Sequence, residues 1–90
     1  MEETIKLIVL EHYNLISKIE EIPVVEIADP NCKLTDPYSI IGLDEEDKTM
    51  IPFLMGFTRD TEIMISSDKI LTIADPAPTL LEKYLDLIKE

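Results

Sequence analysis

Short stretches of alternating apolar and polar residues, separated mostly by prolines, run along the chain. In the clearest stretch, residues 62–66, Ile63 and Ile65 alternate with their neighbours. Alternation with a period of two predicts a β-strand that buries one face. Residues 69–74 form a second apolar stretch after a polar turn at 67–68, so the pattern predicts a β-hairpin.

Two further strand candidates lie upstream, at residues 32–43 and 50–57. The acidic tract 44–47 separates them. Each candidate contains one proline, Pro37 or Pro52, and proline has no amide hydrogen to donate to a sheet. We therefore expect each proline to lie at a sheet edge, at the start of a strand or at a bulge.

The end of the chain, about residues 77–90, has the pattern of an amphipathic helix. The Asp75-Pro76 pair can open the helix, because proline is pre-set for a first helical turn. Thr79 and Glu82 also have the spacing of a capping box. We expect the helix to lie across one face or end of the sheet through an apolar stripe of Leu80, Leu81, Tyr84, Leu85 and Ile88.

Residues 5–22 are compatible with two different structures. Apolar residues recur at helical spacing through this segment, and periodicity alone favours one helix. The segment is also compatible with two β-branched strands, 5–10 and 16–22, joined by residues 11–14. The choice between them decides the fold class.

Length and cysteine content indicate one domain, residues 1–90, that gains from assembly. A chain of 90 residues buries a modest core, and Cys32 is its only cysteine, so no internal disulfide can stabilise it. Association into a homo-oligomer is the remaining source of stability. A lone thiol predicts a reducing cytoplasm. The longest apolar run, Leu7 to Leu10, is too short for a membrane span, so we expect no membrane partner.

The charge balance is strongly acidic. Eight Lys plus Arg stand against nineteen Asp plus Glu, for a net charge of −11. Such a field repels phosphate backbones at long range. The composition therefore argues against a protein that coats DNA or RNA, although it leaves room for a local, shielded site.

Residues 65–73 resemble the second sequence motif of Sm and Sm-like proteins. That motif is an apolar residue, Arg-Gly, two polar residues, an apolar residue and a further apolar residue three positions on. Ser66 and Ser67 replace the Arg-Gly pair. The positions that fit are Ile65, Asp68, Ile70 and Ile73.

Residues 31–36 are similar to the tail of the first Sm motif, which runs Asn, apolar, any, Leu, any, Asp. Ile27 stands where that motif has its earlier Asp. The resemblance covers roughly residues 5–75. The chain also resembles small Sm-like proteins encoded by marine phages that infect cyanobacteria, which implies the cytoplasm of an infected host.

The resemblance implies a mainly β fold: five strands within about residues 4–74 in a bent antiparallel sheet closing into a small open barrel, with the helix last. It favours the strand pair for residues 5–22. It also implies a homo-oligomeric ring of about five to seven subunits, in which the fourth strand of one subunit pairs with the fifth of the next. The expected interface residues are Glu62, Ile63, Met64, Ile65, Ile70, Leu71 and Ile73.

In Sm-like rings, two loops facing the pore hold single-stranded RNA. Carried over by position, the tentative RNA-binding residues are Asn31, Ser66, Ser67 and Lys69. Asn31 keeps a donor and an acceptor for a base edge, but neither loop contains an aromatic residue for stacking. The resemblance thus implies an RNA-binding ring with a role in RNA or DNA processing. The alternative is an acidic oligomeric interaction or scaffold protein that binds no nucleic acid.

No pattern predicts an enzyme, a catalytic residue, a cofactor or a metal site. His12 is the only histidine, and no nucleophile or orienting acid stands at a recognisable spacing from it. The acidic tract 44–47 lacks the alternating ligand spacing of a calcium loop. Both features are typical of exposed turns and solvated loops.

Overall fold

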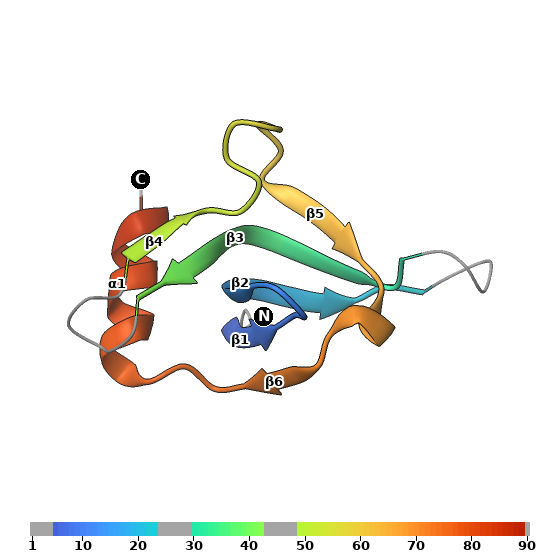
Figure 1. Cartoon of the computed structure of the whole chain (residues 1–90), viewed down its shortest axis with the longest axis horizontal. Helices are drawn as coiled ribbons and strands as arrows, with labels where there is room; N and C mark the ends of the chain where they lie inside the picture. Colours follow the sequence, from blue (N-terminus) through green and yellow to red (C-terminus); the bar gives the residue numbers. More distant parts are fainter. Residues whose placement is uncertain (1–4, 24–29, 43–48, 90) are drawn as a thin grey trace.

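The computed structural model describes residues 5–23, 30–42 and 49–89. Within these ranges the fold is mainly β, with one C-terminal α-helix and one short 3-10 turn (Figure 1). The elements in chain order are β1 (Ile5–Val9), β2 (Asn14–Glu21), β3 (Cys32–Ile41), β4 (Thr49–Pro52), β5 (Glu62–Ile65), η1 (Ser67–Lys69), β6 (Thr72–Ala74) and α1 (Pro78–Ile88).

All described strands belong to one antiparallel sheet in the order β4-β3-β2-β1-β6, with β5 also paired to β3. β5 pairs with the first part of β3, Cys32–Thr35, and β4 pairs with its last part, Tyr38–Ile41. β4 and β5 therefore form one interrupted edge, and the sheet has five strand positions. The sheet is not closed into a barrel, because the described strands at its two edges do not pair with each other.

Residues 5–22 form two strands, which confirms the strand pair and shows that the helix favoured by periodicity alone is wrong. β1 and β2 pair from Ile5↔Lys18 to Val9↔Asn14. The turn between them is closed by a hydrogen bond from Leu10 N to Tyr13 O of 2.8 Å. The apolar residues that suggested a helix also fit the strand pair, because a strand buried on both faces need not alternate apolar with polar residues.

The predicted hairpin of 62–66 with 69–74 is wrong. β5 pairs with β3, whereas β6 pairs with β1 at the opposite edge. The 3-10 turn η1 lies between them, with hydrogen bonds from Lys69 N to Ser66 O and from Ile70 N to Ser67 O. The sequence pattern predicted the first strand well and only the end of the second, 72–74, and it carries no information on which neighbour each strand takes.

A bulge in β3 interrupts its pairing with β2. Ile16 pairs with Tyr38 and Lys18 with Thr35, so Ser17 alone opposes two residues, Asp36 and Pro37. Asp36 has a φ of 52°, a backbone conformation that non-glycine residues seldom adopt. A bulge bends and twists the strand that carries the extra residue. The expectation that Pro37 lies at a bulge is confirmed.

The expectation for Pro52 is confirmed too, because it ends the edge strand β4.

Side chains on both faces of the sheet are buried. Neighbouring residues of β2 point to opposite faces, so Leu15 and Ile16 belong to different clusters. We call them the inner cluster (Ile8, Leu15 and Leu34, with Leu10, Ile19, Phe53, Ile65 and Ile70 packed around it) and the helix-side cluster (Ile16, Leu80 and Tyr84, with Ile5, Leu7, Tyr38, Ile40, Met50, Ala77 and Ile88).

The C-terminal helix is confirmed, and it packs on the helix-side cluster at one end of the sheet (Figure 1). Pro78 occupies its first turn, and the N-cap residue Ala77 makes no side-chain capping bond. The predicted capping box is therefore wrong, because Thr79 lies inside the helix. Leu80 and Tyr84 are buried, whereas Leu85 of the predicted stripe is 43% exposed.

Tyr84 joins the helix to the bulge of β3. Its side chain is fully buried, and its hydroxyl donates to Asp36 O at 2.8 Å, with Thr35 O 3.3 Å away. Its ring also packs edge-to-face on Tyr38, with 5.9 Å between the ring centroids. The helix thus supplies a hydrogen-bond donor to a backbone carbonyl of the bulge.

We expect Tyr84→Phe to lower the free energy of unfolding by about 1–2 kcal/mol, because it leaves a buried backbone carbonyl without its donor. Urea unfolding at one fixed protein concentration measures this change. Tyr13→Phe makes the same chemical change at a side chain that is 51% exposed, and should alter stability by less than about 0.5 kcal/mol. Equal effects of the two substitutions would contradict the role of Tyr84.

Candidate nucleic-acid interface

The two loops expected to bind RNA are in contact. Ser67 donates its backbone N–H to Asn31 Oδ1 at 2.7 Å, and Asn31 Nδ2 donates to Ser67 Oγ at 3.0 Å. These residues are 36 positions apart in the sequence. They meet because Asn31 directly precedes β3, and the β3–β5 register brings the start of β3 beside the end of β5.

The two hydrogen bonds leave part of the Asn31 amide available. A primary amide has two N–H donors and an oxygen with two lone pairs, so one of each remains. Asn31 is half-buried, and Pro30 before it is exposed. Ile27, which stands at the position of the earlier Asp of the first motif, lies outside the described residues, and so does Asp29 of the first loop.

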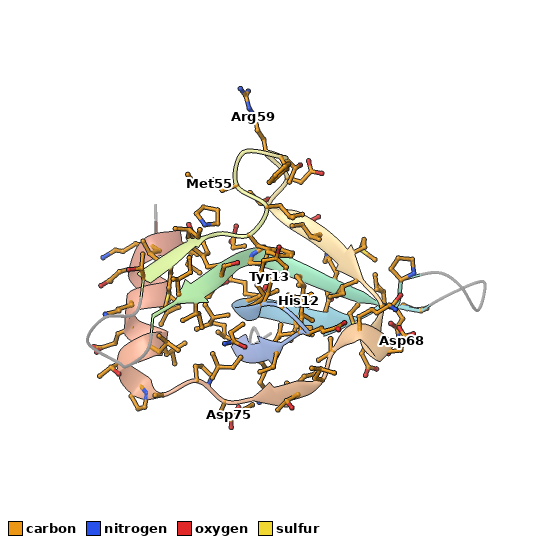
Figure 2. All side chains as sticks on the ribbon, viewed as in Figure 1. His12, Tyr13, Met55, Arg59, Asp68 and Asp75 are labelled. Carbon is orange, nitrogen blue, oxygen red and sulfur yellow. The ribbon has the colours of Figure 1, made fainter. Side chains whose placement is uncertain are left out.

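The second loop is formed by η1 and the residue before it. Ser66 is half-buried, and its carbonyl accepts the hydrogen bond from Lys69 N at 3.0 Å. Lys69 is exposed and forms no ion pair with any residue that the structure describes. Asp68, labelled in Figure 2, is exposed next to it and offsets its positive charge.

A cavity of about 520 Å³ lies beside these loops, between the segment from η1 to β6 and the strands β1 and β2. Sequence patterns did not indicate this cavity, because the pairing of β6 with β1, strands about 65 residues apart in the chain, is what brings its walls together. Its lining consists of Lys6, Ile19, Glu20, Glu21, Cys32, Ser67, Ile70, Leu71, Thr72 and Ile73.

Two lysines near this cavity, Lys6 and Lys33, form ion pairs. Lys6 pairs with Asp75. Lys33 Nζ lies 2.9 Å from Glu20 and 3.8 Å from Glu62. The hydrogen bond to Glu20, followed by the negative charges of Glu20 and Glu62, raises the pKa of the Lys33 ammonium. Lys33 thus offsets the charge of Glu20, and Glu21 adds a negative charge on the side of the cavity formed by β2.

Cys32, the only cysteine, also lines the cavity but is 4% exposed. Burial raises the pKa of its thiol, and the negative charge of Glu21 adds to the effect. A raised pKa lowers the thiolate fraction at neutral pH, so the environment disfavours nucleophilic chemistry at this residue.

The residues expected at the subunit interface differ in how far they are buried. Ile65 and Ile70 pack against the inner cluster, so their side chains belong to the core of one subunit. Met64, Leu71 and Ile73 are 45%, 65% and 51% exposed and remain available to a partner. Of the other two expected residues, Ile63 is half-buried and Glu62 is exposed.

Among the described residues, no group of three His, Cys, Asp or Glu side chains is placed to hold a metal ion. The acidic tract 44–47 lies outside those residues. His12 is exposed in the turn between β1 and β2, 3.9 Å from Glu11. No helix in the described part of the chain is both long and apolar enough to cross a bilayer.

Residues 3–89 match the model of a family described as "Family of unknown function (DUF6561)". The chain belongs to this family. A search of curated proteins found no match. The match covers almost the whole chain, so the sheet, the helix and both candidate loops all lie within the matched residues.

We expect Asn31→Ala to speed hydrogen exchange at the Ser67 amide roughly fivefold, since the amide loses a hydrogen bond of about 1 kcal/mol. Residue-resolved hydrogen exchange measures this rate. The amide of Leu71, bonded to Val9 O at 2.8 Å, is the internal control and should keep its rate. Asn14→Ala, at an exposed asparagine, is the matched substitution. An unchanged Ser67 rate would show that the two loops are not joined in solution.

Proposed function

We propose that this protein is an Sm-like homo-oligomeric ring that binds single-stranded RNA through Asn31 and the loop Ser66–Lys69. The observation that carries the proposal is the pair of hydrogen bonds between Asn31 and Ser67. Both motif skeletons are incomplete by themselves. Their direct contact in three dimensions supports one two-part site rather than two unrelated turns. A cytoplasmic location, expected from the lone thiol, is part of this proposal.

The positions of the two sheet edges support the ring. β5 lies at one edge and β6 at the other, so each subunit offers two different edges to its neighbours. Unpaired backbone groups along an edge strand are completed when another chain adds to it. Contacts between two different surfaces are head-to-tail, and they close into a ring when the rotation between subunits allows it.

The exposed side chains of these edges favour association in the same way. Met64 on β5 and Leu71 and Ile73 at β6 are large apolar residues left partly in water. Covering them in a neighbour contact stabilises the assembly by about 25 cal/mol per Å² of apolar surface buried.

The chemistry of the loops supports single-stranded RNA over duplex. Asn31 retains one donor and one acceptor, which suits the edge of an unpaired base. Lys69 adds one cation per subunit, and a ring repeats that cation around its pore. Asp68 is repeated with it, so the ring offers one ammonium donor per subunit to the RNA without a net positive charge at the loops.

A second candidate function, an acidic interaction ring without nucleic acid, rests on one specific observation. Glu20 and Glu21 line the cavity next to the loops, while Lys6 is already paired with Asp75. An acidic surface of this kind attracts basic protein partners and repels phosphate.

The ring predicts a mass of about five to seven subunits for the purified protein in light scattering coupled to size-exclusion chromatography. Met64→Glu places a charge on the β5 edge and should shift the protein towards single subunits. Leu87→Glu makes the same change at a side chain that is 47% exposed on α1 and should leave the mass unchanged. A wild-type protein that stays monomeric at every concentration would refute the ring.

RNA binding predicts a gel shift with single-stranded RNA at about 50 mM salt that weakens as salt rises. Lys69→Glu should weaken binding about tenfold or more, and Asn31→Ala several-fold. Lys83→Glu, at an exposed lysine of α1, is the matched control for charge. If wild-type protein gives no shift at low salt and a basic protein partner is captured instead, the second candidate function is favoured.

A further inference from the structure

The loop between β4 and β5, residues 53–61, exposes an unusual amount of apolar surface. Phe57 is 87% exposed, Met55 64% and Leu54 39%. Figure 2 shows Met55 and Arg59 on this loop, with Arg59 extending away from the body of the protein. Arg59 is the only arginine in the chain. Clustered exposed apolar side chains of this kind mark a contact surface on small proteins.

The loop is held in shape by its own backbone. Met55 N donates to Pro52 O at 3.1 Å, and Phe57 N donates to Leu54 O at 2.9 Å. Leu54 and Gly56 have φ values of 61° and 90°, in the left-handed region that tight turns use. These turns present Phe57 to solvent.

Contacts with the sheet hold both ends of the loop. Phe53 N donates to Pro37 O at 2.9 Å, and Asp36 N donates to Thr61 O at 2.7 Å. The ring of Phe53 packs edge-to-face on Tyr13, with 5.4 Å between centroids. A loop fixed at both ends and turned outward loses little conformational entropy when its tip is bound.

The cavity under β6 has complementary chemistry. Its aliphatic walls are formed by Ile19, Ile70, Leu71 and Ile73, and Glu21 lies on its β2 side next to Glu20, which is paired with Lys33. Its volume is about 520 Å³, and it is open to solvent on one side, so an aromatic side chain from another molecule can reach its apolar walls. An apolar loop tip with one arginine is chemically complementary to apolar walls flanked by the Glu21 carboxylate.

The loop and the cavity lie on opposite edges of the same chain. Figure 1 shows the loop projecting beyond β4 and β5 at the top of the view, with β6 at the bottom. The loop therefore cannot fill the cavity of its own subunit. A second copy can supply it, because the loop flanks β5 and the cavity is lined by β6 residues, the two edges proposed to pair in the ring.

We propose that the loop 53–61 of one subunit inserts Phe57 into the cavity beneath β6 of the next subunit, with Arg59 facing Glu21. This inference rests on the proposed ring and adds to it a side-chain contact that sets subunit order and register. A second copy is favoured over an anionic membrane, because its cavity offers apolar walls to Phe57 and the Glu21 carboxylate to Arg59.

Two matched substitutions test the apolar part of the contact in sedimentation or light-scattering measurements across a concentration series. Phe57→Ser should raise the apparent dissociation constant of the assembly about tenfold or more. Leu87→Ser, at an exposed leucine of α1, should leave it unchanged. Circular dichroism checks that both variants keep the wild-type spectrum.

A charge exchange tests the pairing. Arg59→Glu should weaken assembly, because it sets a carboxylate against Glu21, and adding Glu21→Lys in the same chain should restore it. A photoreactive phenylalanine analogue at position 57 should cross-link to residues 19–21 or 70–73 of another copy, as mass spectrometry can show.

The outcomes separate this inference from the ring on which it rests. A wild-type protein that is monomeric at all concentrations refutes both. A wild-type oligomer that Phe57→Ser leaves intact, or whose cross-links map elsewhere, refutes the loop insertion alone. Loss of assembly in Arg59→Glu without recovery by Glu21→Lys refutes the pairing of Arg59 with Glu21.

Discussion

The bulge of β3 at Asp36 and Pro37 is the constraint on which the rest of the structure depends. An extra residue removes backbone groups from the strand ladder, and buried groups of this kind need other partners. The hydroxyl of Ser17, which is fully buried, lies 2.8 Å from Lys18 O and 3.1 Å from Thr35 O, and Tyr84 donates to Asp36 O at 2.8 Å. The bulge thereby links β2, β3 and α1.

The same bulge divides the edge of the sheet into two parts. β5 pairs with β3 before the bulge and β4 pairs with it afterwards, so the chain between them leaves the sheet opposite Asp36 and Pro37. An interrupted edge gives the protein both a short strand suited to pairing and an apolar loop beside it. The proposed strand pairing and the proposed loop insertion thus share one structural origin.

Acidic and apolar features have separate locations in this fold. Apolar side chains fill two clusters on the two faces of the sheet and remain exposed mainly at the edges, on the loop 53–61 and on α1. Glu20 and Glu21 lie at the end of β2, close to the Asn31–Ser67 contact. Carboxylates there select against long stretches of phosphate backbone, so any RNA contact must be short and depend on bases.

The sequence by itself determined that the chain is rich in strands, that a helix follows them and where both prolines lie, because these follow from local periodicity and from the missing amide hydrogen of proline. The strand candidates 50–57 and 69–74 were too long, since strand is observed only at 49–52 and 72–74. For residues 5–22 periodicity favoured a helix, and the motif resemblance correctly favoured two strands. Local patterns could not decide that β5 and β6 take partners at opposite edges, since alternation is the same whichever strand lies alongside. Only the tertiary structure brought Asn31 to Ser67 and formed the cavity under β6, because both depend on pairing between residues distant in the chain.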